Sequence, residues 1–284
     1  MSIRKLLPSL GAALCAFAVT PSAMAGLGIG ESLYIDFGKN DVSNGIIMPA
    51  DGPMNTDAGN STGVPDAYGI YWNNAWTNTA TAGGPVPPDP VINLINSQNV
   101  PTGIDLVFTE GWESNGFNNG GLLNPDPALL GEFASKNAVG DYFFINKPFT
   151  AGQQGIASMT FYGLDTSLTY DFKIFATRAE NQVRITEYTI IDINGTHTLL
   201  YQTSGAGIGA GGYNGNNDEF ATFSGIVPNE FGEITLTVRV AQSDFAYIGA
   251  LQLTAVPEPS QLALLAFGAG CLVVFTIRRR RAQN

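Results

Sequence analysis

Cysteine and histidine are almost absent from this sequence, which has two cysteines and one histidine in 284 residues. Both cysteines, Cys15 and Cys271, lie in apolar stretches close to the two ends of the chain. The long segment between them therefore offers no thiol for a disulfide, a thiolate metal site or a cysteine nucleophile. His197 is accompanied by no GxSxG or HExxH motif. Histidine-dependent chemistry is therefore not expected, and His197 is interpreted as a hairpin residue.

Basic residues are also scarce. The chain has 13 Lys and Arg against 24 Asp and Glu. Outside residues 26–255 lie six of the basic residues (Arg4, Lys5 and four C-terminal arginines) and one acid, Glu258. Residues 26–255 therefore hold 7 basic and 23 acidic residues (13 − 6 and 24 − 1), a formal charge of −16. Such a surface repels nucleic acid and anionic lipid, so no nucleic-acid partner is expected. It suits solubility outside the cell or cation binding.

The N-terminus predicts export. Arg4 and Lys5 form a positive segment, residues 6–19 are mostly apolar, and Ala23 and Ala25 supply the small residues of a cleavage site. This arrangement is typical of a secretory signal peptide over residues 1–25, cleaved by signal peptidase after Ala25.

The C-terminus holds a second apolar segment between two polar elements. Residues 262–277 are 16 uncharged residues, which reach about 24 Å as a helix, against about 30 Å for a bilayer core. They predict a short, marginal transmembrane helix. The four arginines after it hold that side in the cytoplasm, so the folded part faces outward. The flanking elements are Val256, Pro257, Glu258 and Pro259 on one side, and Arg278, Arg279, Arg280 and Arg281 on the other.

This order of Pro-Glu-Pro, short helix and basic cluster over residues 256–284 resembles the PEP-CTERM sorting signal of bacterial surface proteins. The resemblance implies processing by an exosortase, a membrane cysteine protease-like enzyme, near the Pro-Glu-Pro motif. Many genes of that family lie beside exopolysaccharide loci. The protein is then anchored in the inner membrane before processing, and afterwards lies at the cell surface or in the extracellular matrix. From hydropathy alone, an ordinary tail anchor is the alternative.

Between the two signals, alternating patterns predict one all-β domain over residues 26–255, an antiparallel β-sandwich with long loops. Ile234, Leu236 and Val238 share one face of a strand whose other face is polar. The turn at Asn194 and Gly195 predicts a hairpin over residues 183–202, and residues 126–134 predict a short helix capped by Asp126. Strands are expected at residues 32–38, 103–109, 142–146, 155–164, 169–178, 184–193, 197–203, 219–227, 232–241 and 245–254.

Two segments of this region resemble jelly-roll domains of the galactose-binding-like group. They are the Gly-Leu-Asp turn with its Tyr-initiated strand at residues 163–178, and the closing strand around residues 247–251. The resemblance covers residues 155–254. It implies a jelly-roll-like sandwich, a tendency toward carbohydrate binding through loops at one end, and often a structural calcium. Members of that group are frequently non-catalytic.

Four residues in Asn- and Gly-rich surroundings are candidates for glycan binding: Trp72, Asn73, Trp76 and Trp112. Aromatic faces in loops can stack on a sugar ring while neighbouring amides bind its hydroxyls. The alternative is that the tryptophans close the open ends of the sandwich.

Catalytic and metal-binding patterns are weaker. Residues 207–212 fit GxGxxG, but the residues after them are typical of a loop and not of a helix that would hold a pyrophosphate. Carboxylate pairs such as Glu110 with Glu113, or Asp218 with Glu219, could serve a glycan hydrolase, but in a chain with 23 acids between its two ends chance pairs are common, and solvated loop acids are the favoured explanation. Oxygen ligands for a structural Ca²⁺ occur at residues 57–66, 192–194 and 214–219, without EF-hand spacing.

The sequence supports two functional hypotheses. The first is an exported, non-catalytic surface or matrix protein that binds extracellular polysaccharide. The second is an exported glycan-active hydrolase that uses a carboxylate pair. The sorting signal and the lack of a nucleophile, thiol or histidine cluster favour the first.

Overall fold

The computed structural model describes residues 26–38, 65–76, 87–109, 111–115, 119–147 and 155–258. The predicted signal peptide, the apolar C-terminal run, the four arginines and Glu110 lie outside this part of the chain. Among the described residues, no helix has the length and apolar character needed to cross a membrane.

The strands follow one another closely along the chain. They are β1 (Ser32–Gly38), β2 (Asn73–Trp76), β3 (Val91–Ile95), β4 (Pro101–Phe108), β5 (Glu113–Asn115), β6 (Tyr142–Asn146), β7 (Ile156–Tyr162), β8 (Leu168–Phe175), β9 (Arg184–Asp192), β10 (Gly195–Ser204), β11 (Ala221–Ile226), β12 (Ile234–Gln242), β13 (Phe245–Ile248) and β14 (Ala250–Pro257). The short helices are α1 (Pro127–Leu130), η3 (Gly131–Phe133), α2 (Lys136–Val139) and η4 (Ala210–Gly212). The strands predicted from the alternation are present, except that the one expected at residues 245–254 is divided at Gly249 into β13 and β14, which belong to different sheets. Asp126 caps α1 by accepting from the Ala128 N–H.

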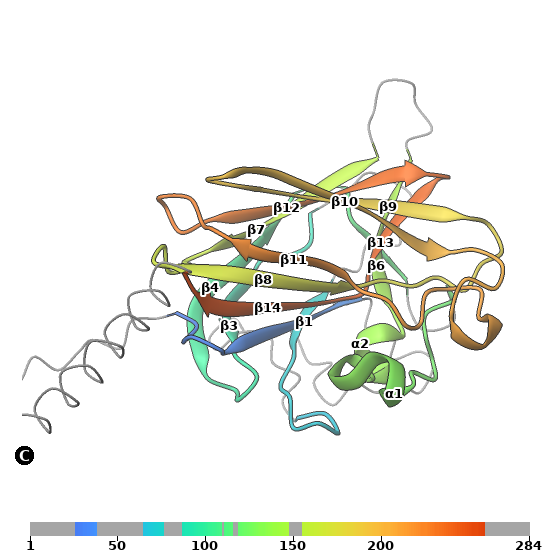
Figure 1. The fold of residues 1–284 in the computed structure, drawn as a ribbon, viewed down its shortest axis with the longest axis horizontal. Coiled ribbons are helices and arrows are strands. Elements are labelled where there is room, and N and C mark those ends of the chain that lie inside the picture. The colour runs from blue at the N-terminus through green and yellow to red at the C-terminus, as the bar shows by residue number, and fades with distance from the viewer. Residues whose placement is uncertain are drawn as a thin grey trace, which may run out of the picture.

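The strands form two large sheets and one small sheet. The five-stranded sheet has the order β11-β8-β14-β1-β2, and the six-stranded sheet has the order β10-β9-β12-β7-β4-β3. The small sheet, β13-β6-β5, lies at one end (Figure 1). Pairing is antiparallel throughout except between β1 and β2, which run parallel. The predicted antiparallel, jelly-roll-like sandwich is confirmed.

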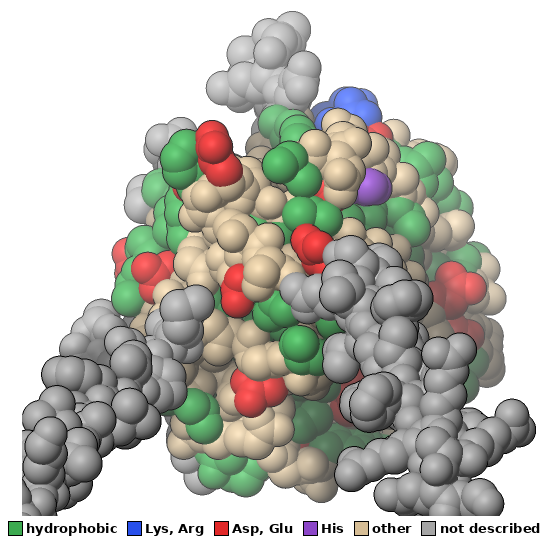
Figure 2. Space-filling model, turned by 60° about the vertical axis from the view of Figure 1, so that its left-hand side comes forward, with side chains coloured by type: hydrophobic (Ala, Val, Ile, Leu, Met, Phe, Trp, Pro, Cys, Tyr) green, Lys and Arg blue, Asp and Glu red, His purple; other side chains and the backbone are tan. Residues whose placement is uncertain are grey.

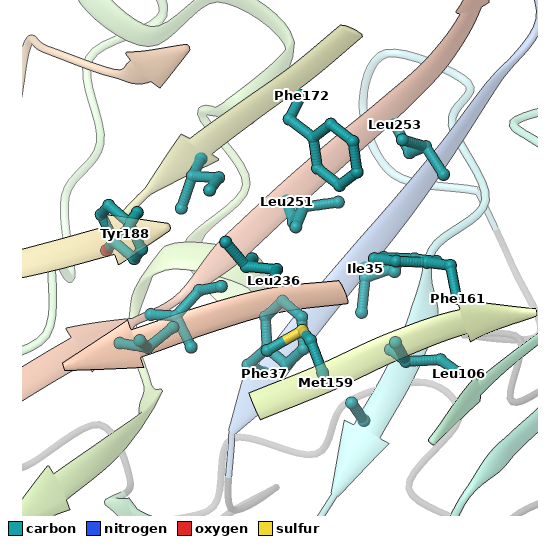
Figure 3. Packing of buried hydrophobic residues seen from close by; sticks show 14 of the residues in the cluster. Ile35, Phe37, Leu106, Met159, Phe161, Phe172, Tyr188, Leu236, Leu251 and Leu253 are labelled. Atoms are coloured by element: carbon teal, nitrogen blue, oxygen red, sulfur yellow. The ribbon is translucent and has the colours of Figure 1, made fainter. Parts of the chain in front are cut away.

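The core lies between the two large sheets. Ile234, Leu236 and Val238 of β12 are buried, as their alternation predicted. Figure 3 shows Leu236 among side chains from both sheets. Phe161 of β7 and Phe172 of β8 meet across the core with their rings 5.8 Å apart. One hydrophobic layer therefore holds the sandwich together.

Strand β1 is buried on both faces, although its sequence predicts only alternation. Leu33, Ile35 and Phe37 enter the main core. On the opposite face, Tyr34 packs against Trp72 at 5.2 Å and Phe133 at 6.1 Å between ring centroids. The α1 to α2 segment covers this face and builds a second, smaller hydrophobic cluster.

The β9–β10 hairpin is confirmed, but its turn lies one residue earlier than expected. Asp192 pairs with Gly195, so Ile193 and Asn194 are the central residues. Neither has the positive φ of a type I′ turn. Instead, the Asp192 carboxylate accepts the N–H groups of Asn194 and Gly195 at 2.8 and 2.9 Å. A side-chain bond thus replaces the turn geometry that the Asn-Gly pair suggested.

The pairing of β14 with β8 defines two ends of the sandwich. At one end Pro257 lies opposite Leu168, and at the other end Ala250 lies opposite Phe175. We call these the Pro257 end and the Arg178 end, since Arg178 follows β8. They lie on opposite sides of Figure 1, with the helices near the Arg178 end. Figure 2 turns the Pro257 end toward the viewer, and acidic side chains are scattered there among uncharged ones.

Candidate functional site

The tryptophans proposed as glycan-binding faces are interior residues where the structure describes them. Trp72 is 2% exposed, and its indole N–H donates to the Asp66 carboxylate at 2.9 Å. Asn73 is buried, and its amide bonds to the backbone of Tyr34 and Ile95. Neither side chain is open to a ligand, so the expectation that Trp72 offers an exposed stacking face and Asn73 an amide for sugar hydroxyls is wrong. Trp72 instead anchors the cover over β1.

Trp112 is likewise fully buried. Its ring packs against Phe108 and Phe143 at centroid distances of 6.5 and 5.9 Å, and its N–H donates to the Ser158 carbonyl at 3.2 Å. The short strand β5 follows it directly, and three residues in Asn- and Gly-rich sequence are too few to show alternation. The backbone of Trp76 pairs with Gly38 in β2, while its side chain lies outside the described part.

A different group of aromatic and basic side chains gathers at the Arg178 end. Tyr142 of β6 and Tyr247 of β13 meet edge to face, with centroids 5.1 Å apart. The Tyr142 hydroxyl donates to the Asn119 carbonyl at 2.6 Å, and the Arg178 guanidinium donates to that hydroxyl through Nη1. Arg178 also lies over the Tyr142 ring, 5.9 Å from its centroid.

Arg184, the second cation of this group, is fully engaged by its neighbours. It donates to the Tyr247 hydroxyl and to Gln182 Oε1, the latter at 3.3 Å, and its Nη2 lies 3.9 Å from a Glu180 carboxylate oxygen. Its guanidinium also lies 4.7 Å from the centroid of the Phe245 ring. Arg184 is 8% exposed and therefore serves to hold the group together.

Backbone and amide contacts fix the loops around Arg178. The Ala179 N–H donates to the Gly120 carbonyl at 2.6 Å, and Gly120 has a φ of +88° that disfavours any side chain there. Asn214 accepts from the Gly207 N–H at 2.8 Å and donates to Asn181 Oδ1 at 2.7 Å. The Gly-rich loop is thus tied to the segment that carries Arg178. The loop contains only the single 3₁₀ turn η4, so it offers no helix N-terminus that could hold a pyrophosphate.

Burial raises the pKa of Tyr142 above its ordinary value, although Arg178 acts in the opposite direction. Burial likewise raises the pKa of Tyr247, again against the influence of Arg184. Both phenols therefore stay neutral at pH 7. Each can accept a hydrogen bond from an arginine without neutralising the positive charge of the guanidinium. The site keeps two positive charges, with Glu180 as the acid in contact with Arg184.

The predicted carboxylate pairs have other partners. Glu113 accepts from the amide of Asn146. Asp218 and Glu219 lie in the loop after β10, where their backbone N–H groups donate to Asn216 Oδ1 at 3.4 and 3.0 Å. Glu110 lies outside the described residues. The structure therefore shows no geometry for the Glu110–Glu113 pair, and it shows Asp218 and Glu219 bonded through their backbone to Asn216.

The loops considered for calcium use their oxygens internally. Asp66 accepts the N–H groups of Tyr68 and Ile70 at 2.8 and 3.0 Å, and Asp192 binds its own turn. Within the ranges that the structure describes, no group of three or more His, Cys, Asp or Glu side chains could hold a metal ion. Residues 57–64 of the first candidate loop lie outside those ranges.

At the other end, the first residues of the predicted sorting signal belong to the folded sheet. Val256 and Pro257 are the last residues of β14 and lie opposite Thr169 and Leu168 of β8. The strand therefore continues past residue 255, where the sequence placed the end of the domain. Sorting motif and sandwich are joined without a linker.

Comparison with family models identifies the PEP-CTERM protein-sorting motif at residues 255–281. The chain therefore carries this signal, which confirms the resemblance seen in the sequence. The motif implies an exported protein that is sorted to the cell surface after processing by an exosortase. A comparison with curated protein sequences finds no match.

Solved structures with some likeness include several carbohydrate-binding modules. A family 35 module from Clostridium thermocellum is 10% identical, with 58% of this chain and 97% of that chain covered and a TM-score of 0.29. The TmCBM61 module in complex with β-1,4-galactotriose is 15% identical, with coverages of 50% and 86% and a TM-score of 0.25. A CBM36-1 xylanase domain from the hindgut metagenome of Trinervitermes trinervoides is 21% identical, with coverages of 39% and 83% and a TM-score of 0.23. Because these TM-scores lie below 0.3, the fold and the site are assigned from the contacts of this chain's own residues.

Proposed function

We propose that this protein is an exported, non-catalytic protein of the bacterial surface or extracellular matrix, which binds polysaccharide through its Arg178 end. The observation that carries the proposal is the position of the sorting motif. It begins in β14 at the Pro257 end, opposite the end where Arg178, Arg184 and two tyrosines gather.

This arrangement limits how far the Pro257 end can lie from the membrane in the anchored precursor of our proposal. Four residues, 258–261, separate Pro257 from the apolar run. At about 3.8 Å per Cα step, the Pro257 end stays within about 19 Å of the bilayer while the run is inserted. The eight residues of β8 separate the Arg178 end from the Pro257 end by about 25 Å, at about 3.3 Å per residue. The arginine and tyrosine group therefore lies at the end of the sandwich that is distant from the point of attachment.

Charge supports an extracellular role. Residues 26–255 carry a formal charge of −16, which keeps the domain soluble and repels nucleic acid and anionic lipid surfaces. Signal peptidase acts first, the short helix holds the precursor in the inner membrane, and an exosortase then releases the domain from the helix.

The test uses the processed protein recovered from cells that express the whole chain. We expect it outside the inner membrane and retained by at least one polysaccharide on a glycan array. We also expect no new reducing ends after incubation with that polysaccharide. Release of reducing ends would establish the hydrolase instead, and loss of reducing-end release in a Glu113→Gln or Glu219→Gln variant would locate it. Retention by no glycan would leave a purely structural surface role.

A further inference from the structure

Arg178 differs from the other well-anchored cations of the domain. Lys173 lies 3.9 Å from Glu132, Arg184 lies 3.9 Å from Glu180, and the Arg239 guanidinium contacts Glu187 at 2.5 Å. Arg178 forms no salt bridge with any residue that the structure describes, which is also true of Lys136 and Lys147, but the Arg178 guanidinium is in addition held by the Tyr142 hydroxyl. This is notable in a domain in which acids outnumber basic residues by 23 to 7.

The guanidinium of Arg178 is held in place, although it forms no ion pair within the described residues. Nη1 donates to Tyr142, whose own proton goes to the Asn119 carbonyl, so the phenol oxygen faces the arginine. The Arg178 backbone N–H donates to the Thr203 carbonyl at 3.0 Å. Nε is buried and has no hydrogen-bond partner within the described residues. The side chain is therefore oriented before any ligand arrives.

Acids lie close to the group in sequence, among them Asp141, Glu180 and Asp218, but none of them forms a salt bridge with Arg178 in the described part of the chain. Asn119 is preceded by Gly116, Phe117 and Asn118, none of which is acidic. Glu180 contacts Arg184, and the hydroxyls near both arginines belong to neutral tyrosines. A half-buried cation without a counter-ion has lost part of its hydration, so a carboxylate that reaches it is bound more strongly than at an exposed cation.

We propose that Arg178 binds the carboxylate of an acidic sugar, so that the ligand of this end is a uronate-bearing polysaccharide. The inference rests on the proposed polysaccharide-binding function and names the class of ligand. Tyr142 positions the guanidinium, and Arg184 lies nearby in contact with Glu180. The exposed amide of Asn181, whose Oδ1 accepts from Asn214, lies at the edge of the site and can donate its own N–H groups to sugar hydroxyls.

The acids at the opposite end of the domain have little effect on this binding. At about 0.15 M salt the screening length is about 8 Å, so the acids of the Pro257 end, about 25 Å away, contribute little at Arg178. At low salt the screening length is greater, so the acids of the Pro257 end repel an acidic polymer bound at Arg178. Binding of the acidic polymer should therefore hold or improve between low and physiological salt, unlike binding to a generally basic surface.

The experiment is affinity electrophoresis of the processed protein in gels that contain polygalacturonate, alginate or hyaluronate. Each gel is compared with one that contains the carboxyl-reduced form of the same polymer. The reduced polymers keep the sugar backbone and lose the charge. We expect at least one acidic polymer to bind about 10-fold more tightly than its reduced form. Arg178→Gln should abolish that preference, and Arg178→Lys should retain part of it because the charge remains.

Arg239→Gln is the matched control, because it removes the same group from an exposed position of β12 and should leave the preference unchanged. Melting curves of each variant establish that it is folded. The proposal is overturned if no acidic polymer is preferred over its reduced form, or if folded Arg178→Gln keeps the preference. Binding of reduced polymers alone would overturn this inference and leave the polysaccharide function intact, whereas binding of no glycan would overturn both.

Discussion

Pro257 lies directly opposite Leu168, so the first proline of the Pro-Glu-Pro motif is also the last residue of strand β14. One residue earlier, the Thr169 hydroxyl donates to the Val256 carbonyl at 3.4 Å. The sorting signal and the sandwich therefore share residues. A cut before Val256 would remove part of the sheet, and a cut beyond Glu258 would leave β14 whole.

Processing is predicted to follow this boundary. The exported protein should begin after Ala25 and end at or just after Glu258, because that position lies outside the paired strand. Mass spectrometry of the protein recovered outside the inner membrane measures both ends. A chain that still ends at Asn284 would contradict the sorting account, and a chain that ends before Val256 would contradict the boundary.

Truncation of Leu236 to alanine should lower the free energy of unfolding by about 2–5 kcal/mol, because the side chain is fully buried between the sheets. The control is Leu200→Ala, which makes the same change at a residue that is 61% exposed on β10 and should cost under about 0.5 kcal/mol. Chemical denaturation of both variants gives the comparison. Equal losses of unfolding free energy at the two positions would contradict the assignment of Leu236 to the hydrophobic core.

Replacement of Trp112 by alanine should cost about 3–5 kcal/mol of folding free energy, since a fully buried aromatic side chain is lost. Trp72→Ala should behave in the same way. Protein that stays folded should keep its polysaccharide affinity, because neither ring is open to a ligand. An affinity loss with an unchanged melting temperature would restore the tryptophans as binding residues.

The sequence predicted the sheets better than the site, for physical reasons that particular residues show. Ile234, Leu236 and Val238 alternate with polar residues over a full strand, and such a pattern has one stable arrangement at a sheet surface. Trp112 precedes a strand of three residues, too short for alternation to be visible. Its Asn- and Gly-rich neighbours made an interior residue resemble a loop residue.

The Arg178 group could not be predicted, because its members come from distant strands. Tyr142 and Tyr247 lie more than 100 residues apart and meet only when β13 pairs with β6. Arg178 could have drawn notice as one of only seven basic residues between the two signals. Its lack of a salt bridge among the described residues is a tertiary property.

Asp192 should make stability depend on acid pH. Burial acts to raise its pKa, but hydrogen bonds from Val227, His197 and Asn194 lower the pKa below its ordinary value of 3.8. A group with a lowered folded-state pKa stabilises the fold above its unfolded-state pKa, and the contribution is lost as pH falls through the folded value. Asp192→Asn should therefore cost about 1–3 kcal/mol at pH 7. Denaturation series should show this difference shrinking below pH 3.8, and a constant difference down to pH 2 would contradict the assignment.

Hydrogen exchange of the processed protein, with and without the polysaccharide that it binds most tightly, tests most directly whether the Arg178 end is the recognition surface. Amides at residues 119–122, 178–184 and 205–218 should become protected in the complex, while those at residues 96–100, 163–167 and 227–233 at the Pro257 end should exchange unchanged. Protection confined to the Pro257 end, or no protection under saturating polysaccharide, would contradict the account.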